Sequence, residues 1–144
     1  MRTVDRSNVA LSAEDLDVLA GVLDTLIPPS DDGRFPGAGA LGCARQVAEN
    51  CGRVPGLLEL LRSGLRELNH SSVARRGEPF HCLPPDAREQ LLAEQSFVFP
   101  LVIQAYIAYY QHPAVLEALG LEPRPPHPLG YRMSDPGKEP APNA

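Results

Sequence analysis

The chain has 144 residues, of which 43% are hydrophobic and 22% charged, and its formal net charge at pH 7 is -5. A chain of this length and composition is typical of one globular domain and is too short for two independent cores. Because the balance of charge is acidic, it offers no basic footprint for DNA or RNA, and we expect no nucleic-acid partner.

Residues 1–10 are predicted to be a flexible N-terminus ahead of the folded domain. The first residues have no apolar run behind their basic side chains and no twin arginine, so they predict neither a Sec nor a Tat export signal. We therefore expect a cytoplasmic protein. A periplasmic location would require a start that is truncated or a partner that carries the signal.

The first predicted helix follows in SAEDLDVLAGVLDTLI, residues 12–27. Ser12 is a suitable N-cap, Asp15 three residues later has the spacing of a capping box, and leucines then recur at helical intervals. Pro28 and Pro29 end this helix.

The loop LIPPSDDGRFPGAGALG, residues 26–42, is rich in turn residues. Its adjacent Asp31 and Asp32 suggest a metal site, but calcium loops place carboxylates at alternate positions, and aspartate and glycine are also common in simple turns. We expect the loop to be architectural, with Gly37 and Ala38 allowing the next helix to approach closely and one of the two aspartates accepting from backbone amides.

Helical patterns continue from the loop to residue 120, and no convincing stretch alternates with the period of a strand. Phe80 and Leu83 are expected to anchor a short connecting segment, and SSVARR to form a separate helical turn that ends at Gly77. The sequence thus predicts an all-α domain over residues 11–120, a compact bundle of about five to six helices. Those after the loop are expected at residues 40–52, 55–70, 84–95, 97–110 and 113–120.

The most apolar window, residues 97–110, is shorter than the roughly 20 residues that span a bilayer, and Pro100 and Gln104 interrupt it. We expect a core helix and no direct membrane insertion. Since neighbouring residues point about 100° apart on a helix, Tyr109 and Tyr110 cannot both face one core. At least one of them is expected to face an edge or a partner.

Residues 121–144 contain seven prolines among 24 residues, a composition that predicts an extended, Pro-rich C-terminal strap. The segment HPLGYRM inside it carries apolar side chains that a solubilising tail does not need. We expect the strap to lie on a surface, either its own domain's or a partner's.

Catalytic and metal-binding signatures are weak. The three cysteines form no CxxC pair, and no phosphate-binding or nucleophile-elbow motif is present. One alternative is a free-standing helical enzyme or small-ligand-binding protein that uses Cys82 with His81 or His112. Another is a homodimeric structural protein that associates through the aromatic helix.

The order of motifs resembles the gluconate 2-dehydrogenase subunit 3 family from about Leu11 to Tyr131. The sequence contains LIPPSDD, then PGA, GLRELN, a G-x-P-F segment, YYQHPAVLEALG and a late GY. The residues that match the family's shared PP-D-PGA signature, and that we expect to be fold markers, are Pro28, Pro29, Asp31, Pro36, Gly37 and Ala38.

This resemblance implies a non-catalytic accessory subunit that binds and stabilises a large FAD-dependent sugar or polyol dehydrogenase of the glucose-methanol-choline type. FAD is then expected in the partner, and no catalytic, cofactor-binding or metal-binding residue in this chain. The family's exporting members carry a Tat signal, so this sequence fits a cytoplasmic heterodimer better. Because interfaces favour aromatic side chains, the expected partner contacts are Phe97, Tyr109, Tyr110, Leu129, Tyr131 and Met133.

Overall fold

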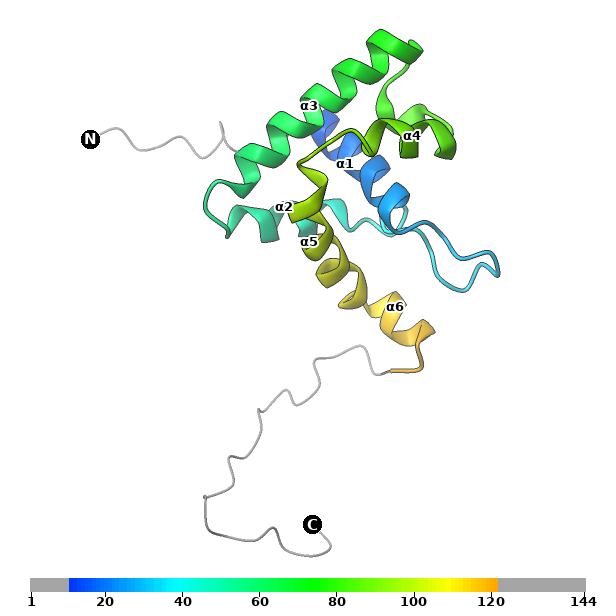
Figure 1. Ribbon diagram of the computed structural model, residues 1–144. Coiled ribbons are helices and arrows are strands. Elements are labelled where there is room, and N and C mark those ends of the chain that lie inside the picture. The colour runs from blue at the N-terminus through cyan, green and yellow to red at the C-terminus, as the bar shows by residue number, and fades with distance from the viewer. Residues whose placement is uncertain (1–10, 122–144) are drawn as a thin grey trace, which may run out of the picture.

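A computed structural model describes residues 11–121 of the chain (Figure 1). In this range the backbone forms helices and turns without a strand, so the predicted all-α bundle is confirmed. The elements, in chain order, are α1 (Ala13–Leu26), α2 (Ala44–Gly52), α3 (Leu57–Arg76), the 3₁₀ turn η2 (Phe80–Cys82), α4 (Pro85–Leu92), α5 (Val98–Tyr110) and α6 (Pro113–Ala118). The predicted N-terminal segment and the strap from residue 122 onward lie outside the described residues.

Helix α1 is the central element, since it packs against α2, α3, α4 and η2. It begins with the capping box that the sequence predicts: the Asp15 amide donates to Ser12 Oγ at 3.1 Å, and the Ser12 amide donates to Asp15 Oδ2 at 3.0 Å. One face of the helix is buried through Val18, Leu19 and Leu23. The helix therefore forms where local capping and hydrophobic periodicity agree.

The hydrophobic core draws on every helix of the bundle. Phe80 of η2 is fully buried and Leu83 nearly so, so both act as the anchors that the sequence predicts. Other side chains with less than 2% exposure include Leu19, Leu23, Val47, Cys51, Leu61, Leu65, Leu68, Leu101 and Val115.

Helix α3 is longer than predicted, because it continues through SSVARR to Arg76 instead of breaking after His70. Ser72 in this stretch is fully buried, and its hydroxyl donates to the carbonyl oxygen of Glu78 at 2.6 Å. A helix tolerates such a serine where the hydroxyl finds a tertiary acceptor, a partner that periodicity does not reveal. Gly77 then ends the helix with a φ of 76°.

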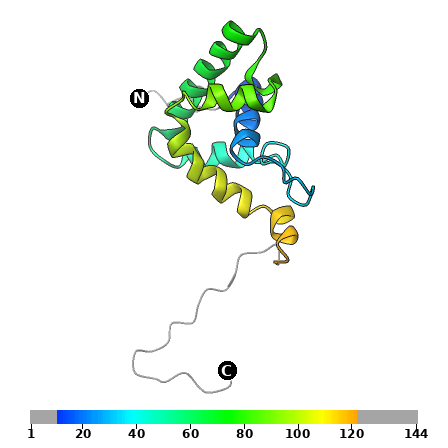
Figure 2. The same ribbon diagram turned by 45° about the vertical axis from the view of Figure 1, so that its right-hand side comes forward.

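Helix α5 is held against the rest of the bundle at its amino-terminal end by Phe97. Gly64 on α3 faces this ring so closely that a Cβ atom at residue 64 would collide with it. From that junction α5 runs away from α3 and α4 toward α6, as Figures 1 and 2 show from two directions. The far half of α5 consequently lies at the edge of the bundle.

Candidate partner-binding surface

Five apolar side chains of α5 are exposed on one side of the helix. We call them the α5 stripe: Phe99, Ile103, Tyr106, Ile107 and Tyr110, with 86%, 63%, 42%, 41% and 49% of their surface exposed. Steps of three and four residues place such side chains on one helical face. The helix VFPLVIQAYIAYY contains no charged residue, so the stripe is an uncharged surface.

The opposite face of α5 is buried in the domain. Leu101, Ala105 and Ala108 are at most 4% exposed, and α5 packs against α2. Apart from Gln104, the helix is therefore apolar around its circumference, a pattern typical of helices that are covered on all sides. Its own domain covers only one of these sides.

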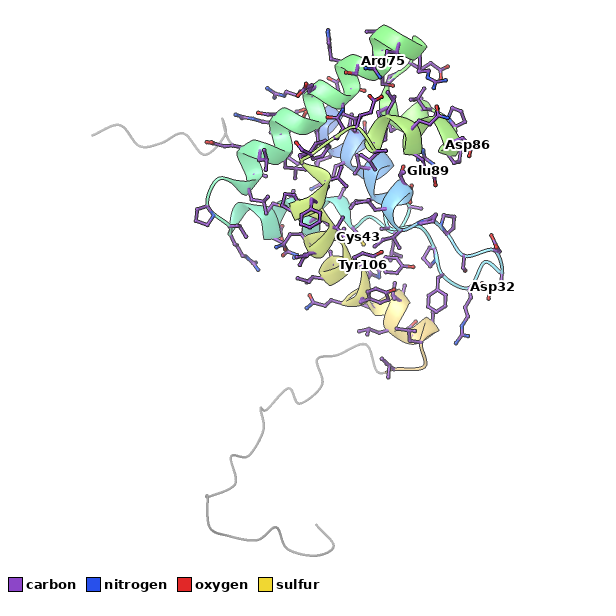
Figure 3. All side chains as sticks on the ribbon, in the orientation of Figure 1. Asp32, Cys43, Arg75, Asp86, Glu89 and Tyr106 are labelled. Atoms are coloured by element: carbon purple, nitrogen blue, oxygen red, sulfur yellow. The ribbon has the colours of Figure 1, made fainter. Side chains whose placement is uncertain are left out.

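The tyrosine rings at the end of the stripe pack against one another. Tyr106, labelled in Figure 3, stacks on Tyr110 with ring centroids 6.0 Å apart and planes 8° apart. Tyr109 meets the Tyr110 ring edge to face at 5.2 Å. Tyrosine has few rotatable bonds, so prearranged rings lose little conformational entropy when a partner covers them.

Of the predicted partner contacts, Tyr110 belongs to the stripe, whereas Phe97 and Tyr109 are 5% and 3% exposed. Phe97 packs on α3, and the Tyr109 hydroxyl donates to the carbonyl oxygen of Pro36 at 2.7 Å. These two side chains position α5 and do not face outward. Burial, with Tyr110 and Cys43 nearby, raises the pKa of Tyr109.

The other three predicted contacts, Leu129, Tyr131 and Met133, lie outside the described residues. The prediction also passed over the two most exposed members of the stripe, Phe99 and Ile103. Their spacing with Tyr106 and Tyr110 places all four on one helical face. The sequence alone does not show whether that face is buried or exposed.

The loop between α1 and α2 is fixed by contacts with α1 that explain its glycines. Asp24 Oδ1 accepts from the Gly39 amide at 2.8 Å and the Ala40 amide at 3.1 Å. A Cβ atom at Gly37 would collide with the Asp24 carboxylate, and one at Gly39 with the Ala20 carbonyl oxygen. The start of α2 can therefore approach α1 only because these residues lack side chains.

The remaining signature residues of this loop surround the same turn. Ala38 is 1% exposed, and its amide donates to the Ile27 carbonyl oxygen at 3.0 Å. Of the two aspartates, Asp32 accepts from Ser30 Oγ at 2.7 Å and the Arg34 amide at 3.0 Å. These hydrogen bonds lower the pKa of Asp32. Pro28 and Pro29 follow Ile27, the C-cap of α1, and Asp31 is exposed.

A small pocket lies where this loop meets α5 and α6, and we call it the loop pocket. Its volume is about 210 Å³, and it is lined by Ile27, Pro28, Ser30, Phe35, Tyr109, Tyr110 and Leu119. The Arg34 guanidinium links the loop to the end of α6. It donates to the Ala118 carbonyl oxygen at 3.0 Å from Nε and 2.6 Å from Nη2. Because Tyr110 belongs to both, the loop pocket adjoins the α5 stripe.

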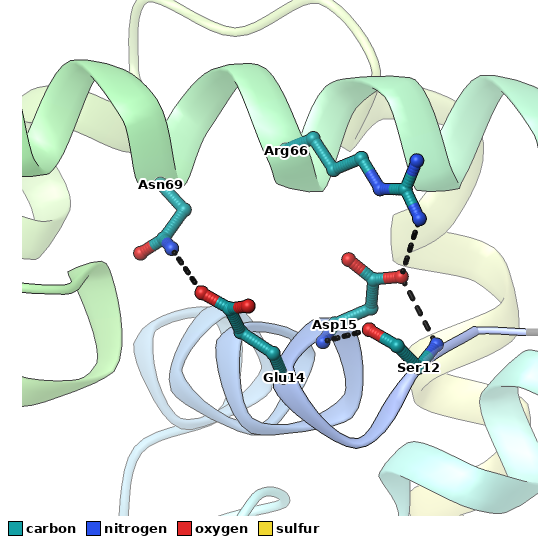
Figure 4. Close-up of polar contacts among 5 residues, drawn as sticks. All are labelled: Ser12, Glu14, Asp15, Arg66 and Asn69. Carbon is teal, nitrogen blue, oxygen red and sulfur yellow. Dashed lines mark hydrogen bonds and ion pairs between the residues drawn. The ribbon is translucent and has the colours of Figure 1, made fainter.

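A second, more polar pocket of about 420 Å³ lies between the start of α1 and α3. Its polar side chains bind one another, as Figure 4 shows: Asn69 Nδ2 donates to Glu14 Oε1 at 3.3 Å, and Arg66 lies 3.5 Å from the buried Asp15 carboxylate. Asn69 Oδ1 also accepts from the Phe80 amide at 2.9 Å. These contacts tie α1 to α3 and η2, which is a structural role.

The cysteine and histidine side chains considered as catalytic groups differ in their exposure and in their hydrogen bonds. Cys82 is exposed and His81 is partly buried, while His112 caps α6 by accepting from the Ala114 amide at 3.1 Å. Cys43 and Cys51 are buried, and burial raises the pKa of Cys51 to about 11, which makes that thiol a poor nucleophile. In residues 11–121 no three histidine, cysteine or acidic side chains gather to bind a metal ion.

No helix in the described part of the chain has the length and apolar character needed to cross a membrane. Residues 13–97 match a family model described as gluconate 2-dehydrogenase subunit 3. No curated protein and no solved structure matches the chain. Since the matched residues span more than half of its length, the chain belongs to the gluconate 2-dehydrogenase subunit 3 family.

Proposed function

We propose that this member of the gluconate 2-dehydrogenase subunit 3 family is a non-catalytic accessory subunit. In this proposal it binds and stabilises a large catalytic subunit of the glucose-methanol-choline type, which holds FAD and oxidises a sugar or polyol. The family description supports the coarser part of the proposal, membership of a dehydrogenase complex. The FAD-dependent partner rests on the resemblance of the motif order to that family.

The observation that carries the proposal is the α5 stripe. Large apolar side chains with up to 86% exposure lie together on a helix without a charged residue. The cores of protein interfaces are depleted in charged residues and enriched in aromatic ones. Covering an apolar surface of this kind with a partner is favourable, because it removes the apolar side chains from water.

In this proposal, binding of the small subunit is itself what stabilises the catalytic subunit. A subunit that binds the folded catalytic subunit and not its unfolded chain shifts the folding equilibrium by mass action, by about 2.7 kcal/mol at one hundred times the dissociation constant. This mechanism needs no catalytic group in the small subunit. It requires a preformed surface, which the contacts of Phe97 and Tyr109 provide by holding α5 in place.

The expected cytoplasmic location belongs to the same proposal. In this proposal the chain forms a heterodimer with a soluble flavoprotein in the cytoplasm. Fractionation of the native host, with detection of the tagged chain, tests this part separately.

The experiment is purification of the tagged chain from its native host, followed by an absorption spectrum of whatever elutes with it. We expect a larger partner with a flavin absorption band at about 450 nm. A colourless chain that elutes alone would contradict the proposal. A colourless dimer would favour the homodimeric alternative, and dehydrogenase activity that depends on Cys82 in the isolated chain would favour the enzymatic one.

A further inference from the structure

The loop pocket has the size and lining of a site for protein side chains. Its volume of about 210 Å³ is below the roughly 300–1,000 Å³ that is usual for small-molecule and cofactor sites. Its walls are mainly apolar and aromatic, from Pro28, Phe35, Tyr109, Tyr110 and Leu119. Aromatic-lined grooves of this kind bind Pro-rich segments, because an extended proline segment loses little entropy on docking.

The described chain ends beside this pocket. After α6 the backbone turns at Gly120, which has a φ of 77°, and the Leu121 amide donates to the Leu116 carbonyl oxygen at 2.8 Å. Leu119, a wall of the pocket, is only two residues before Leu121. The Pro-rich residues 122–144 therefore start next to the aromatic surface that suits them.

We propose that the segment around Leu129, Tyr131 and Met133 docks in the loop pocket of its own chain. In an extended conformation, the eight steps along the chain from Leu121 to Leu129 span up to about 25 Å. The segment of α5 from Ile103 to Tyr110 is only about 10 Å long. The connecting residues are thus long enough for the chain to double back onto the pocket.

The chemistry of the segment matches that of the pocket. Leu129, Tyr131 and Met133 are the large apolar side chains of residues 122–144, and prolines precede them at residues 126 and 128. A tyrosine ring and a methionine thioether both pack well on aromatic rings such as Tyr110 and Phe35. No charged side chain lines the pocket. The six charged residues of 122–144, three of each sign, therefore find no ion-pair partner among its lining side chains.

The tether favours this occupant over a second copy of the chain. A short connection to the binding site gives an effective concentration in the millimolar range, which a second molecule does not reach in dilute solution. The proposal concerns the isolated chain and does not depend on the proposed function. The part of the α5 stripe nearer to Phe99 remains open for another subunit.

The test uses the full ¹⁵N-labelled chain and backbone relaxation of residues 129–133. We expect order parameters above about 0.6, the range of ordered backbone, and a fall below that value in Tyr110→Ser and in Leu119→Ser. Phe99→Ser is the matched control, because it removes an exposed apolar side chain at the other end of α5 and leaves the pocket intact.

Trypsin cleavage after Arg132 provides a second readout at low protein concentration. We expect cleavage in the unmodified chain to be about tenfold slower than in Tyr110→Ser, because the docked segment is protected. Low order parameters and equal cleavage rates in all variants would overturn the proposal. Order that disappears on dilution would also overturn it, and would assign the pocket to a second copy.

Discussion

Two adjacent tyrosines at the end of α5 have different surroundings. Tyr109 is 3% exposed and donates to the Pro36 carbonyl oxygen at 2.7 Å, whereas Tyr110 is 49% exposed and stacks on Tyr106. Helical geometry predicts that the two cannot face the same core. Which of them turns inward depends on Pro36, 73 residues away in the sequence, so local pattern could not determine it.

Replacing Tyr109 by phenylalanine removes one buried hydrogen bond and little packing. We expect Tyr109→Phe to lower the free energy of unfolding by about 1 kcal/mol, measured by urea denaturation, since the Pro36 carbonyl loses its donor. Tyr110→Phe is the control and should change stability by less than about 0.5 kcal/mol. Equal effects of the two substitutions would argue against the assigned role of Tyr109.

The buried thiol of Cys51 predicts a loss of stability at alkaline pH. Burial raises its pKa from 9.0 to about 11 in the folded chain, so the folded state retains a proton that the unfolded state releases. The contribution of this group to the free energy of unfolding is therefore fully present below pH 9. It falls by roughly 2 kcal/mol as the pH rises from 9 to 11.

Urea denaturation at several pH values checks this expectation by comparing the unmodified chain with Cys51→Ala. The variant should lose less stability between pH 9 and 11, because its remaining alkaline dependence comes from other groups. Cys82→Ser, which changes an exposed thiol, is the control and should follow the unmodified chain. Parallel curves for the unmodified chain and Cys51→Ala would contradict the prediction.

Among the elements, those with local signals follow the sequence most closely. The capping box of Ser12 and Asp15 and the prolines at the first positions of α4 and α6 mark helix starts that the structure contains. The continuation of α3 through Ser72 was not predicted, because the acceptor that satisfies its hydroxyl, the Glu78 carbonyl, appears only when the chain folds back. Tertiary contacts, not propensity, set that boundary.

The contact between α3 and Phe97 depends on the absence of a side chain at Gly64. We expect Gly64→Ala to destabilise the fold by about 1–3 kcal/mol, because the added methyl group displaces the ring. Gly52→Ala is the control: its Cβ atom would meet only Leu58 Cδ2, at 3.8 Å, and alanine favours a helix. Thermal unfolding of both variants measures the difference, and similar melting temperatures would refute the role given to Gly64.

The α1–α2 loop depends on Asp24 as an acceptor for two backbone amides. We expect Asp24→Ala to lower the free energy of unfolding by about 1–3 kcal/mol, because two backbone amides lose a charged acceptor. Asp24→Asn retains one side-chain oxygen and should cost less. Urea denaturation compares the two, and an alanine variant as stable as the asparagine variant would show that the loop does not need this side chain.

For the whole molecule, the fold class follows from the helical periodicity of the sequence and the family from the order of its motifs. The exposed surface follows from neither. An apolar helix such as α5 has no polar face to indicate its orientation, so the sequence could not separate the buried Phe97 and Tyr109 from the exposed Phe99 and Ile103. Their positions depend on Gly64 and Pro36, which lie on other elements. The α5 stripe is a property of the assembled bundle.

The most direct test of the accessory-subunit proposal compares partner binding by two exposed-surface variants. In the double variant Phe99→Ser and Ile103→Ser we expect the amount of flavoprotein that co-purifies to fall by about tenfold or more, since buried aromatic and aliphatic anchors dominate interface energy. The control is Leu60→Ser with Val73→Ser, two apolar residues of α3 with 48% and 49% exposure, and it should retain the partner. If the α5 variant retains the flavoprotein as well as the control does, the α5 stripe is not the surface that binds the catalytic subunit.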